Sequence, residues 1–483
     1  MDTFVTDSKQ QFQTNARSFM VVGVIIALCC LAGILGRPHS FLAILWPANA
    51  VLLGLFLRFN SLKNMGGWLG AFTGFMFADL VTGNHFLLTL FLTMANLTNP
   101  LVTLLLLRTF KIDYKEFNKG LTFVYLVLIS AVGGCLVSPL FAISTIPHIP
   151  NTFMQLDRIW IDFGMWWTGE ILNLVAFLPI ILAIPQMDSI KDYIAEKRQQ
   201  RLRLQDGLPL LFVMFSVGLT HFFMGPGAIM FPIGALIWAA LTYNLFLVSI
   251  VNCFVSMSLY NILSIYYLTE SSDAYISTTL SVRIGLVMLA LGPLTLSIIS
   301  LNRQKLYHHI LYLANHDGLT TTMNRRYFYE ESERTVNPAK ANTKTVAILL
   351  LDIDHFKRIN DNYGHAVGDQ VLQDFTRIVQ AQIRASDLFG RIGGEEFAVL
   401  LKNVSLAKSI EISERICNTV FKTPITLENG QKLNISISIG LSYQSLPFCT
   451  QFQQLINRAD VALYQAKESG RNRLCLEERL QNT

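Results

Sequence analysis

The residues in this sequence best suited to chemistry are acids in two separate segments, namely Asp352, Asp354, Glu395 and Glu396. The first two end an apolar run that begins at Val346 and is typical of a buried strand. The other two directly follow Gly393-Gly394, where a backbone without side chains leaves room for a bulky anion. Because Mg²⁺ takes hard oxygen ligands together with the phosphates of its nucleotide, these acids predict a site for a divalent cation and a nucleoside triphosphate. The alternative is a solvated turn with incidental acids.

Local patterns also suggest the elements that must position these acids. Residues 388–392 and 397–401 are apolar runs around the glycine pair, which predicts a β-hairpin whose tight turn needs positive φ at its centre. We expect a helix over residues 369–383 and a strand over residues 433–441. Helices that alternate with strands predict an α/β domain over residues 317–483, a sheet covered by helices in the split βαβ arrangement. The chain contains no P-loop motif and no strand-linked GxGxxG motif.

The motifs in this half of the chain closely resemble the GGDEF diguanylate cyclases, enzymes that condense two GTP molecules into cyclic di-GMP. They are the turn Gly393-Gly-Glu-Glu-Phe397 and the segment Asp352-Ile-Asp-His-Phe-Lys357. Asp317-Gly-Leu-Thr320, followed by Asn324-Arg-Arg326, also matches the family's opening motif, and we assign it mainly a structural role as a helix cap. The resemblance covers residues 307–480 and implies a palm-like, ferredoxin-like cyclase domain.

The resemblance also implies a role for individual residues. Mg²⁺ or Mn²⁺ would be held by Asp352, the carbonyl of Ile353 and Glu395. The turn at His355, Phe356 and Lys357 would offer backbone N–H groups and the Lys357 charge to the phosphates. Two roles are open for Glu396, which either helps to hold the metal or takes the proton from the attacking hydroxyl.

Asn360 and Asp369 match the positions that read the edge of guanine in this family. The chemistry fits, because a carboxylate can accept hydrogen bonds from N1–H and the 2-amino group, which adenine cannot supply. The alternative for Asp369 is a helix N-cap. Lys467 and Arg471 are four positions apart and share one helical face if their helix continues past Gly470, so we expect them to bind phosphate. As an isolated pair they would be a solvated surface.

A second nucleotide site is suggested just before the hairpin. Arg384 and Asp387, with Arg384 nine positions ahead of Gly393, resemble the RxxD product-inhibition site of the family in residues and spacing. Arg391 is a further candidate contact from the same strand. Arginine and aspartate suit the phosphates and the guanine edge of cyclic di-GMP. The alternative is a surface ion pair at i, i+3.

The composition places part of the chain in a membrane. Hydrophobic residues make up 52% and charged residues only 15% of the 483 residues. The net charge is +5, and the chain has no long basic block interleaved with aromatic residues, so no nucleic-acid partner is implied. Seven cysteines occur without CxxC spacing, which favours reduced core thiols. Repeated apolar stretches over residues 1–301, the last at 284–301, predict a polytopic α-helical membrane domain of eight to ten spans in contact with membrane lipid.

Basic residues indicate the orientation of these spans, because they accumulate on cytoplasmic loops. One side holds Arg58, Lys63, Arg108, Lys111, Lys115, Lys119, Lys191, Lys197, Arg198, Arg201 and Arg203. The other side holds only Arg37, Arg158 and Arg283. We therefore expect a multi-pass protein of the bacterial inner membrane whose catalytic half lies in the cytoplasm.

Several polar side chains lie inside the apolar stretches and should face the interior of the bundle, because lipid does not solvate them. They are Asp79, Asn96, Asn99, Asp162, Glu170, Asn173 and His221. They form either a ligand or ion pocket, which we favour only at Glu170, or interhelical hydrogen bonds that hold the bundle together. The segments Leu45–Ala50 and Trp166–Glu170 resemble the MASE-type membrane sensor family, while a transporter is the competing class for such a bundle.

Residues 302–316 carry an apolar stripe at Leu306, Ile310 and Leu313, which predicts a stiff coupling helix that pairs with its twin; a simple connector is the alternative. The whole sequence is thus interpreted as a membrane sensor domain, a coupling helix and a diguanylate cyclase domain. One domain holds one GTP, so catalysis requires a homodimer. The alternative function is a catalytically silent receptor for cyclic di-GMP or GTP.

Overall fold

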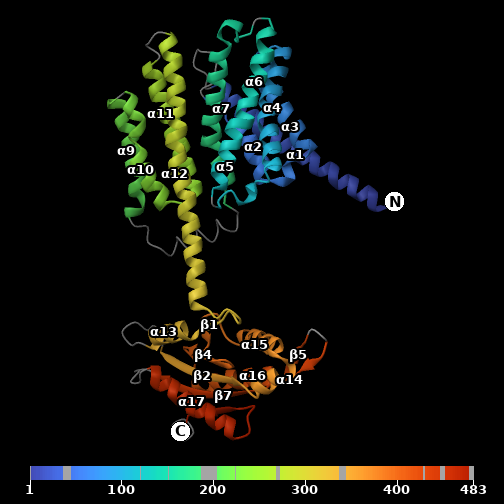
Figure 1. Cartoon of the computed structure of the whole chain (residues 1–483), viewed down its shortest axis with the longest axis vertical. Coiled ribbons are helices and arrows are strands. Elements are labelled where there is room, and N and C mark those ends of the chain that lie inside the picture. The colour runs from blue at the N-terminus through green and yellow to red at the C-terminus, as the bar shows by residue number, and fades with distance from the viewer. Residues whose placement is uncertain are drawn as a thin grey trace. The chain divides into compact units, whose positions relative to one another are not determined.

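The structure is a computed structural model that describes residues 2–35, 45–119, 121–150, 152–185, 204–223, 225–267, 272–336, 344–427, 430–445 and 452–477. The chain divides into two compact units, Met1–Lys305 and Leu306–Thr483, which we term the helical unit and the sheet unit. Among these described residues, Figure 1 shows helices without strands in the first unit and a sheet with helices in the second. Some residues used above lie outside the described ones, namely Arg37, Lys191, Lys197, Arg198, Arg201 and Arg203, as does one of the seven cysteines, Cys449.

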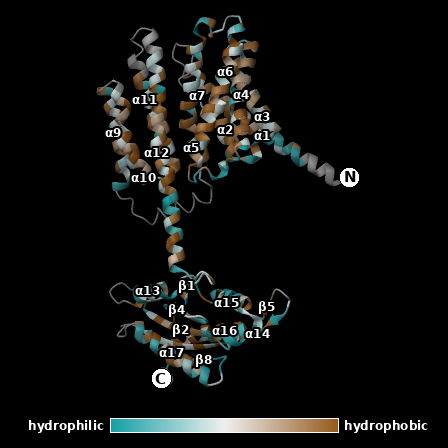
Figure 2. Ribbon diagram, viewed as in Figure 1, coloured by the Kyte–Doolittle hydropathy of each residue, from teal (hydrophilic) through white to brown (hydrophobic). Residues whose placement is uncertain are grey.

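The helical unit is built mainly from apolar helices (Figure 2). Its helices are α1 Asp2–Leu35, α2 Ala48–Arg58, α3 Met65–Val81, α4 Phe86–Thr109, α5 Thr122–Ile129, α6 Cys135–Thr145, α7 Ile159–Leu182, α9 Leu208–Phe222, α10 Ile233–Thr242, α11 Leu245–Tyr267 and α12 Ser272–Asn315. A π-helical segment, Ser130–Gly134, joins α5 to α6. Within the described residues six helical segments are long and apolar enough to cross a membrane, and three apolar helices are shorter. The number of spans therefore stays a prediction.

Small residues allow close packing of α1 against α3. Gly66, Gly70 and Gly74 recur every four residues along one face of α3. A Cβ added at Gly70 would collide with the carbonyl oxygen of Phe19, and one at Gly74 with that of Gly23. The two backbones therefore touch, which is how helices associate where the hydrophobic effect does not drive them together.

The polar residues predicted to face the bundle interior mostly do so. Asp79, Asn96, Asn99, Glu170 and Asn173 are at most 7% exposed, and Asp162 is half-buried. Glu170 on α7 accepts hydrogen bonds from Asn49 Nδ2 at 2.5 Å, Asn99 Nδ2 at 2.5 Å and Trp166 Nε1 at 3.1 Å. These bonds link α2, α4 and α7 through one carboxylate. The prediction was wrong for His221, which is exposed because it lies in the last turn of α9.

The basic-residue pattern predicted that Arg283 lies in a loop, but the structure places it inside a helix. Helix α12 begins at Ser272, so Arg283 is three turns inside it and only 2% exposed. Its guanidinium donates to the hydroxyl of Tyr260 at 3.0 Å and to the carbonyl of Met165. These polar partners and the Tyr260 ring compensate a buried cation, which explains how the residue is tolerated inside a helix. The predicted last span and the coupling helix are both parts of α12.

The sheet unit contains one mixed six-stranded sheet in the order β1-β3-β4-β2-β7-β8 and a separate two-stranded ribbon, β5-β6. The strands are β1 Met323–Asn324, β2 Thr345–Ile353, β3 Leu388–Arg391, β4 Glu396–Lys402, β5 Ile425–Thr426, β6 Lys432–Leu433, β7 Ile437–Ser445 and β8 Leu474–Leu476. The helices are α13 Arg325–Val336, α14 Phe356–Tyr363, α15 His365–Gln380, α16 Leu406–Lys422 and α17 Phe452–Glu468. This confirms the predicted α/β class.

The central strand β2 packs helices on both of its faces, which explains its continuous apolar run. Ala347, Leu349 and Leu351 belong to a core that includes residues of α15 and α16. Val346, Ile348 and Leu350 belong to a second core with residues of α13 and α17. By this alternation Asp352 lies on the same face of the sheet as α17.

Three local predictions in this unit were wrong in detail. Helix α15 begins at His365 rather than 369, and the segment predicted as one strand, 433–441, is divided between β6 and β7. Neither Gly393 nor Gly394 has positive φ. The connection is wider than a two-residue turn, since the N–H groups of Ile392 and Gly393 both donate to the carbonyl of Glu396. A Cβ at Gly393 would lie against the Glu396 side chain, so its carboxylate would have to shift.

Candidate active site

The two predicted acidic segments meet where β2 ends and β4 begins. Asp352 pairs directly with Glu396 in the antiparallel register of these strands, so their side chains lie on the same face of the sheet. The N–H of Ile353 donates to the carbonyl of Glu395 at 3.4 Å. Asp352 is 7% exposed, Glu395 is half-buried and Glu396 is exposed. The register therefore brings three carboxylates from distant segments into one small region.

Both Asp352 and Glu395 have raised pKa values. Burial is the main cause of the raised pKa of Asp352, and the negative charge of Asp354 adds to it, whereas Lys467 and Arg471 act against it. Burial also raises the pKa of Glu395, and the charges of Asp352 and Glu396 raise it further. Carboxylates that hinder one another's ionisation create a local negative potential, which favours a cation.

One cation already contacts this cluster. Lys467, in the last turn of α17, forms an ion pair with Asp352 at 2.6 Å. Among the described residues no three or more His, Cys, Asp or Glu side chains are grouped to hold a metal ion. A divalent cation here would therefore use the two carboxylates together with other oxygens, from a backbone carbonyl and a bound phosphate. The donor set is chemically suitable, since all of its atoms are hard oxygens.

Asp354, the fourth acid of the motif, has a structural role. Its carboxylate is 6% exposed and accepts hydrogen bonds from Ser436 Oγ and Ser438 Oγ, both at 2.7 Å, and from the N–H of Asn472 at 3.1 Å. Asp354 thus ties β2 to the segment that follows α17. Sequence reasoning grouped it only with the other strand-end acids, because nothing in the local pattern shows which carboxylate is already satisfied.

The segment after α17 differs from its prediction. The helix ends at Glu468, and Gly470, Arg471 and Asn472 all have positive φ. Lys467 and Arg471 therefore do not share the face of one continuous helix. The charge of Arg471 still opposes the rise in the pKa of Asp352, so both cations act on the carboxylate cluster. The bond from Asn472 to Asp354 helps to hold this turn in place.

The residues expected to bind phosphate and base follow β2 directly. His355 has a φ of 57° and precedes α14, with Phe356 buried and Lys357 exposed. Asn360 in α14 lies against α15, since a Cβ at Gly368 would collide with Asn360 Oδ1. The next residue, Asp369, is therefore near Asn360, as base reading by both residues requires. Asp369 is not a helix N-cap, because Gly364 occupies that position of α15.

The RxxD segment forms a turn. Asp387 accepts a hydrogen bond from the N–H of Arg384 at 3.0 Å and another from the N–H of Lys402 at 3.2 Å. No ion pair between the Arg384 and Asp387 side chains is found among the described residues, so the surface ion-pair alternative is wrong. Arg384 is exposed, and its guanidinium is available to a ligand.

Arg391 connects two motifs that the sequence left separate. Its guanidinium forms an ion pair with Asp317 at 3.0 Å and donates to the carbonyl of Gly394 at 3.1 and 2.7 Å. Asp317 also accepts from the N–H and hydroxyl of Thr320, at 2.9 and 2.6 Å. Arg391 therefore holds the turn before Glu395 against the segment that follows α12. A contact from Arg391 to bound product stays a prediction.

Comparison with known proteins places this geometry in a family. Residues 314–473 match the profile described as diguanylate cyclase, GGDEF domain. The probable diguanylate cyclase DgcF of Escherichia coli K12 is 32% identical over 279 residues, 56% of this chain and 87% of that protein. The chain belongs to the GGDEF diguanylate cyclase family. The sheet unit is accordingly its cyclase unit.

Two further similarities differ in how much of the chain they cover. A probable diguanylate cyclase DgcF from Escherichia coli O157:H7 is 28% identical over 446 residues, 89% of each chain, so that alignment extends into the helical unit. A crystal structure of the GGDEF domain of DgcB from Caulobacter crescentus in complex with c-di-GMP is 32% identical and covers 34% of this chain and 94% of that chain, with a TM-score of 0.33. GGDEF diguanylate cyclases generally use divalent metal ions.

Proposed function

We propose that this protein is a membrane-bound diguanylate cyclase that joins two GTP molecules into cyclic di-GMP and releases two pyrophosphates. The 3′-hydroxyl of each GTP attacks the α-phosphate of the other. The observation that carries the proposal is the meeting of Asp352, Glu395 and Glu396 with Lys467 and Arg471 at one end of β2 and β4. Acids for a metal and cations for phosphates are the two requirements of phosphoryl transfer.

Each residue then has a task. Asn360 and Asp369 orient guanine, and the N–H groups around His355–Lys357 and the charges of Lys467 and Arg471 hold the triphosphate. Lys467 now neutralises Asp352, and its ammonium is free to turn to a phosphate when another cation takes over that carboxylate.

Asp352, the Ile353 carbonyl and Glu395 would hold Mg²⁺ or Mn²⁺, and the bound ion would supply electrostatic stabilisation of the charge on the α-phosphate. Glu396 is exposed and directly opposite Asp352, so its carboxylate can accept the proton of the attacking hydroxyl.

The proposed enzyme is a homodimer, because each domain supplies one GTP. An exposed apolar stripe supports this proposal. Leu306, Ile310 and Leu313 in α12 are 59%, 53% and 58% exposed and recur at helical spacing. A second copy of this helix would cover the stripe as a coiled-coil partner.

We further propose inhibition by the product through Arg384 and Asp387. Support comes from the exposed Arg384 guanidinium and from the covalent path that leads from Asp387 through β3 to the turn with Glu395. The helical unit is proposed to sense a signal in the bacterial inner membrane, with six apolar helices as support.

The experiment that tests the proposed function uses the purified full-length chain. It is incubated with GTP and Mg²⁺, and the products are separated by chromatography. The expected result is one cyclic di-GMP and two pyrophosphates for every two GTP molecules consumed. A protein that binds GTP or cyclic di-GMP without turnover would instead be a silent receptor.

A further inference from the structure

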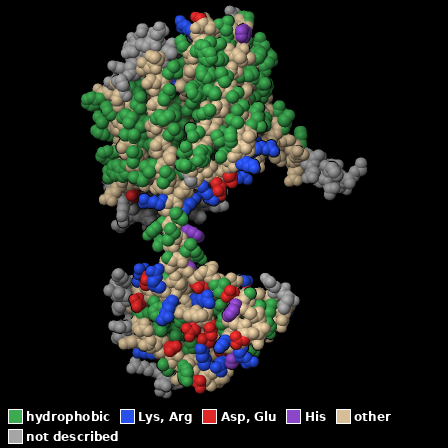
Figure 3. All heavy atoms as spheres, in the orientation of Figure 1, with side chains coloured by type: hydrophobic (Ala, Val, Ile, Leu, Met, Phe, Trp, Pro, Cys, Tyr) green, Lys and Arg blue, Asp and Glu red, His purple; other side chains and the backbone are tan. Residues whose placement is uncertain are grey.

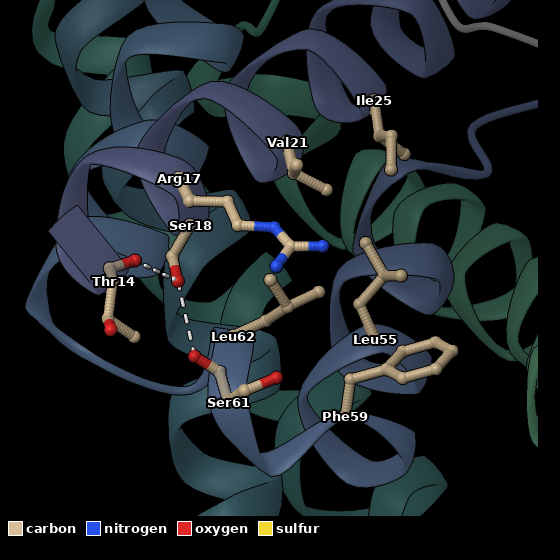
Figure 4. A pocket seen from close by; sticks show the side chains of 9 residues that line it. All are labelled: Thr14, Arg17, Ser18, Val21, Ile25, Leu55, Phe59, Ser61 and Leu62. Carbon is tan, nitrogen blue, oxygen red and sulfur yellow. Dashed lines mark hydrogen bonds between the residues drawn. The ribbon is translucent and has the colours of Figure 1, made fainter.

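The helical unit contains a pocket unrelated to the cyclase motifs. It has a volume of about 390 Å³ and lies between α1 and the end of α2 with the turn that follows it. Figure 4 shows the side chains that line it, which are Thr14, Arg17, Ser18, Val21, Ile25, Leu55, Phe59, Ser61 and Leu62. Nothing in the proposed cyclase reaction uses these residues.

The lining changes from polar to apolar along both of its walls. On α1 the lining runs from Thr14 and Arg17 to Val21 and Ile25, residues that share one helical face. The other wall runs the opposite way along the chain, from Leu55 and Phe59 to Ser61. Ser18 Oγ donates to the carbonyl of Ser61 at 3.1 Å, so the polar ends of the two walls meet.

The polar end is fixed by internal hydrogen bonds. Ser18 is 2% exposed, shares its single hydroxyl proton between the carbonyls of Ser61 and Thr14, the latter at 2.9 Å, and accepts from Asn64 Nδ2 at 2.9 Å. The hydroxyl of Thr14 donates to the carbonyl of Gln10 at 2.9 Å. The hydroxyl groups of Thr14 and Ser18 therefore already have hydrogen-bond partners within the protein.

Arg17 differs from its neighbours because its charge is uncompensated. Its side chain extends into the pocket (Figure 4), and no carboxylate belongs to the lining. Within the described part of the chain, no ion pair involves Arg17. A guanidinium presents parallel N–H donors that match two oxygens of a phosphate. The polar end therefore suits an anion and does not suit an ammonium group.

We propose that this pocket binds an anionic glycerophospholipid, with its phosphate on Arg17 and an acyl chain along Val21, Ile25, Leu55 and Phe59. The inference rests on the membrane placement in the proposed function. Thr14 to Ile25 lie in the apolar segment Gln10–Leu35, near the end at which it begins. Val21 and Phe59 are 37% and 39% exposed, so the apolar wall is open to the surrounding acyl chains.

The location agrees with membrane electrostatics. Figure 3 shows Lys and Arg side chains gathered along one edge of the helical unit and hydrophobic side chains over its flank. Such an edge attracts anionic lipids, each basic residue contributing roughly 1 kcal/mol near the surface. A lipid that joins a phosphate to an acyl chain satisfies both ends of the pocket at once, whereas a free phosphate satisfies only one.

The test measures lipid retention by the full chain with native mass spectrometry. The protein is purified in detergent and incubated with phosphatidylglycerol or with phosphatidylcholine of the same acyl chains. Arg17→Gln removes the charge, and Arg17→Lys keeps it without the planar fork. Arg108→Gln is the matched control, because Arg108 is an exposed arginine at the end of α4 that does not line the pocket.

The expected result is a loss of phosphatidylglycerol binding by about tenfold or more in Arg17→Gln, a change of one phosphate contact worth about 1.4 kcal/mol. Arg17→Lys should retain part of the binding, and Arg108→Gln all of it. Val21→Trp, which fills the apolar end, should also reduce retention.

Equal loss in Arg17→Gln and Arg108→Gln would overturn the proposal, because binding would then depend on overall charge. Equal retention of phosphatidylcholine, or full competition by glycerol phosphate, would overturn it as well. The mass readout does not require turnover, so a failure of the cyclase proposal is seen separately in the product assay. A failure of the membrane placement is seen as protein in the soluble fraction.

Discussion

The ion pair between Asp317 and Arg391 is predicted to stabilise the catalytic turn, and it can be tested with a double-mutant cycle. The variants are Asp317→Asn, Arg391→Gln and the two together. Each removes the charge; Asp317→Asn also keeps the shape of the side chain, whereas Arg391→Gln shortens it and removes the planar guanidinium. Arg391→Gln also removes the two hydrogen bonds to the carbonyl of Gly394, next to Glu395.

The magnitude follows from the distance and the burial of the pair. The charges are 3.0 Å apart, and the side chains of Arg391 and Asp317 are 17% and 25% exposed. At an effective dielectric constant near 20 such charges attract by roughly 5 kcal/mol before desolvation is counted. The net stabilisation by an exposed ion pair is at most about 1 kcal/mol, whereas breaking a buried pair costs about 3–5 kcal/mol. Because this pair is partly buried, we expect a coupling energy between these limits, about 2 kcal/mol. The hydrogen bonds to Gly394 add about 1 kcal/mol each to the effect of Arg391→Gln.

The assay is hydrogen exchange of the full chain, read by mass spectrometry on peptides around β3 and β4. All six tryptophans lie in the helical unit, so tryptophan fluorescence would not report on this turn. We also expect turnover to fall about tenfold or more in Arg391→Gln, because 1.4 kcal/mol of lost positioning corresponds to one factor of ten. Additive effects within about 0.5 kcal/mol in the double variant would refute the reasoning.

The same ion pair predicts that the stability of the folded cyclase unit depends on pH. Burial alone would raise the pKa of Asp317, but hydrogen bonds from Thr320 and the Arg391 charge outweigh it and lower the pKa. Because the pKa is lower in the folded than in the unfolded state, the stabilisation is complete above the unfolded value of about 3.9 and is lost as the pH falls through the folded value. Asp317→Asn should remove this acid-dependent loss, and an unchanged acid profile would count against the role of Asp317.

Three further changes test other parts of the site and the fold. Glu395→Gln should lower turnover at least about 10²-fold while the chain still folds, because it removes a proposed metal ligand and keeps the turn, whereas Glu411→Gln on the surface of α16 should be neutral. Arg384→Ala should weaken binding of cyclic di-GMP and raise its steady-state yield without lowering the initial rate. Equal inhibition of this variant and the wild type by added cyclic di-GMP would exclude the RxxD site. Arg377→Ala, on α15, is the control. Gly440→Ala should destabilise the cyclase unit by about 3 kcal/mol or more, because the new Cβ would collide with backbone atoms of Ala459 and Leu463 in α17, and normal exchange rates in β7 would contradict this.

Selectivity for the base is a further prediction. The wild type should prefer GTP over ATP by as much as about 10⁴-fold, and Asp369→Ala should narrow that ratio, because a polar site rejects a base that leaves its groups unpaired. Equal use of ATP by the wild type would show that Asn360 and Asp369 do not read the base.

Features that depend on neighbours in sequence could be predicted from the sequence. The apolar run from Val346 predicts β2, and the runs around Gly393-Gly394 predict β3 and β4. The coupling helix expected over residues 302–316 is helical as far as Asn315, the last residue of α12. These patterns are local, since a buried strand or an amphipathic turn of helix is determined by spacing over fewer than ten residues or so. The same holds for the family motifs, whose residues are contiguous.

Only the tertiary structure decided which of these residues meet and which are already engaged. Asp317 and Arg391 are 74 residues apart and Asp354 and Asn472 are 118 apart, so their contacts follow from strand order and register. Local spacing predicted that Arg471 lies on a helix, but α17 ends at Glu468. It also predicted that Arg283 lies in a loop, but this residue is inside α12. The physical reason is that hydrogen bonds and ion pairs are made in space. A carboxylate's role depends on which donors the fold brings to it, and that information is absent from the spacing of its neighbours.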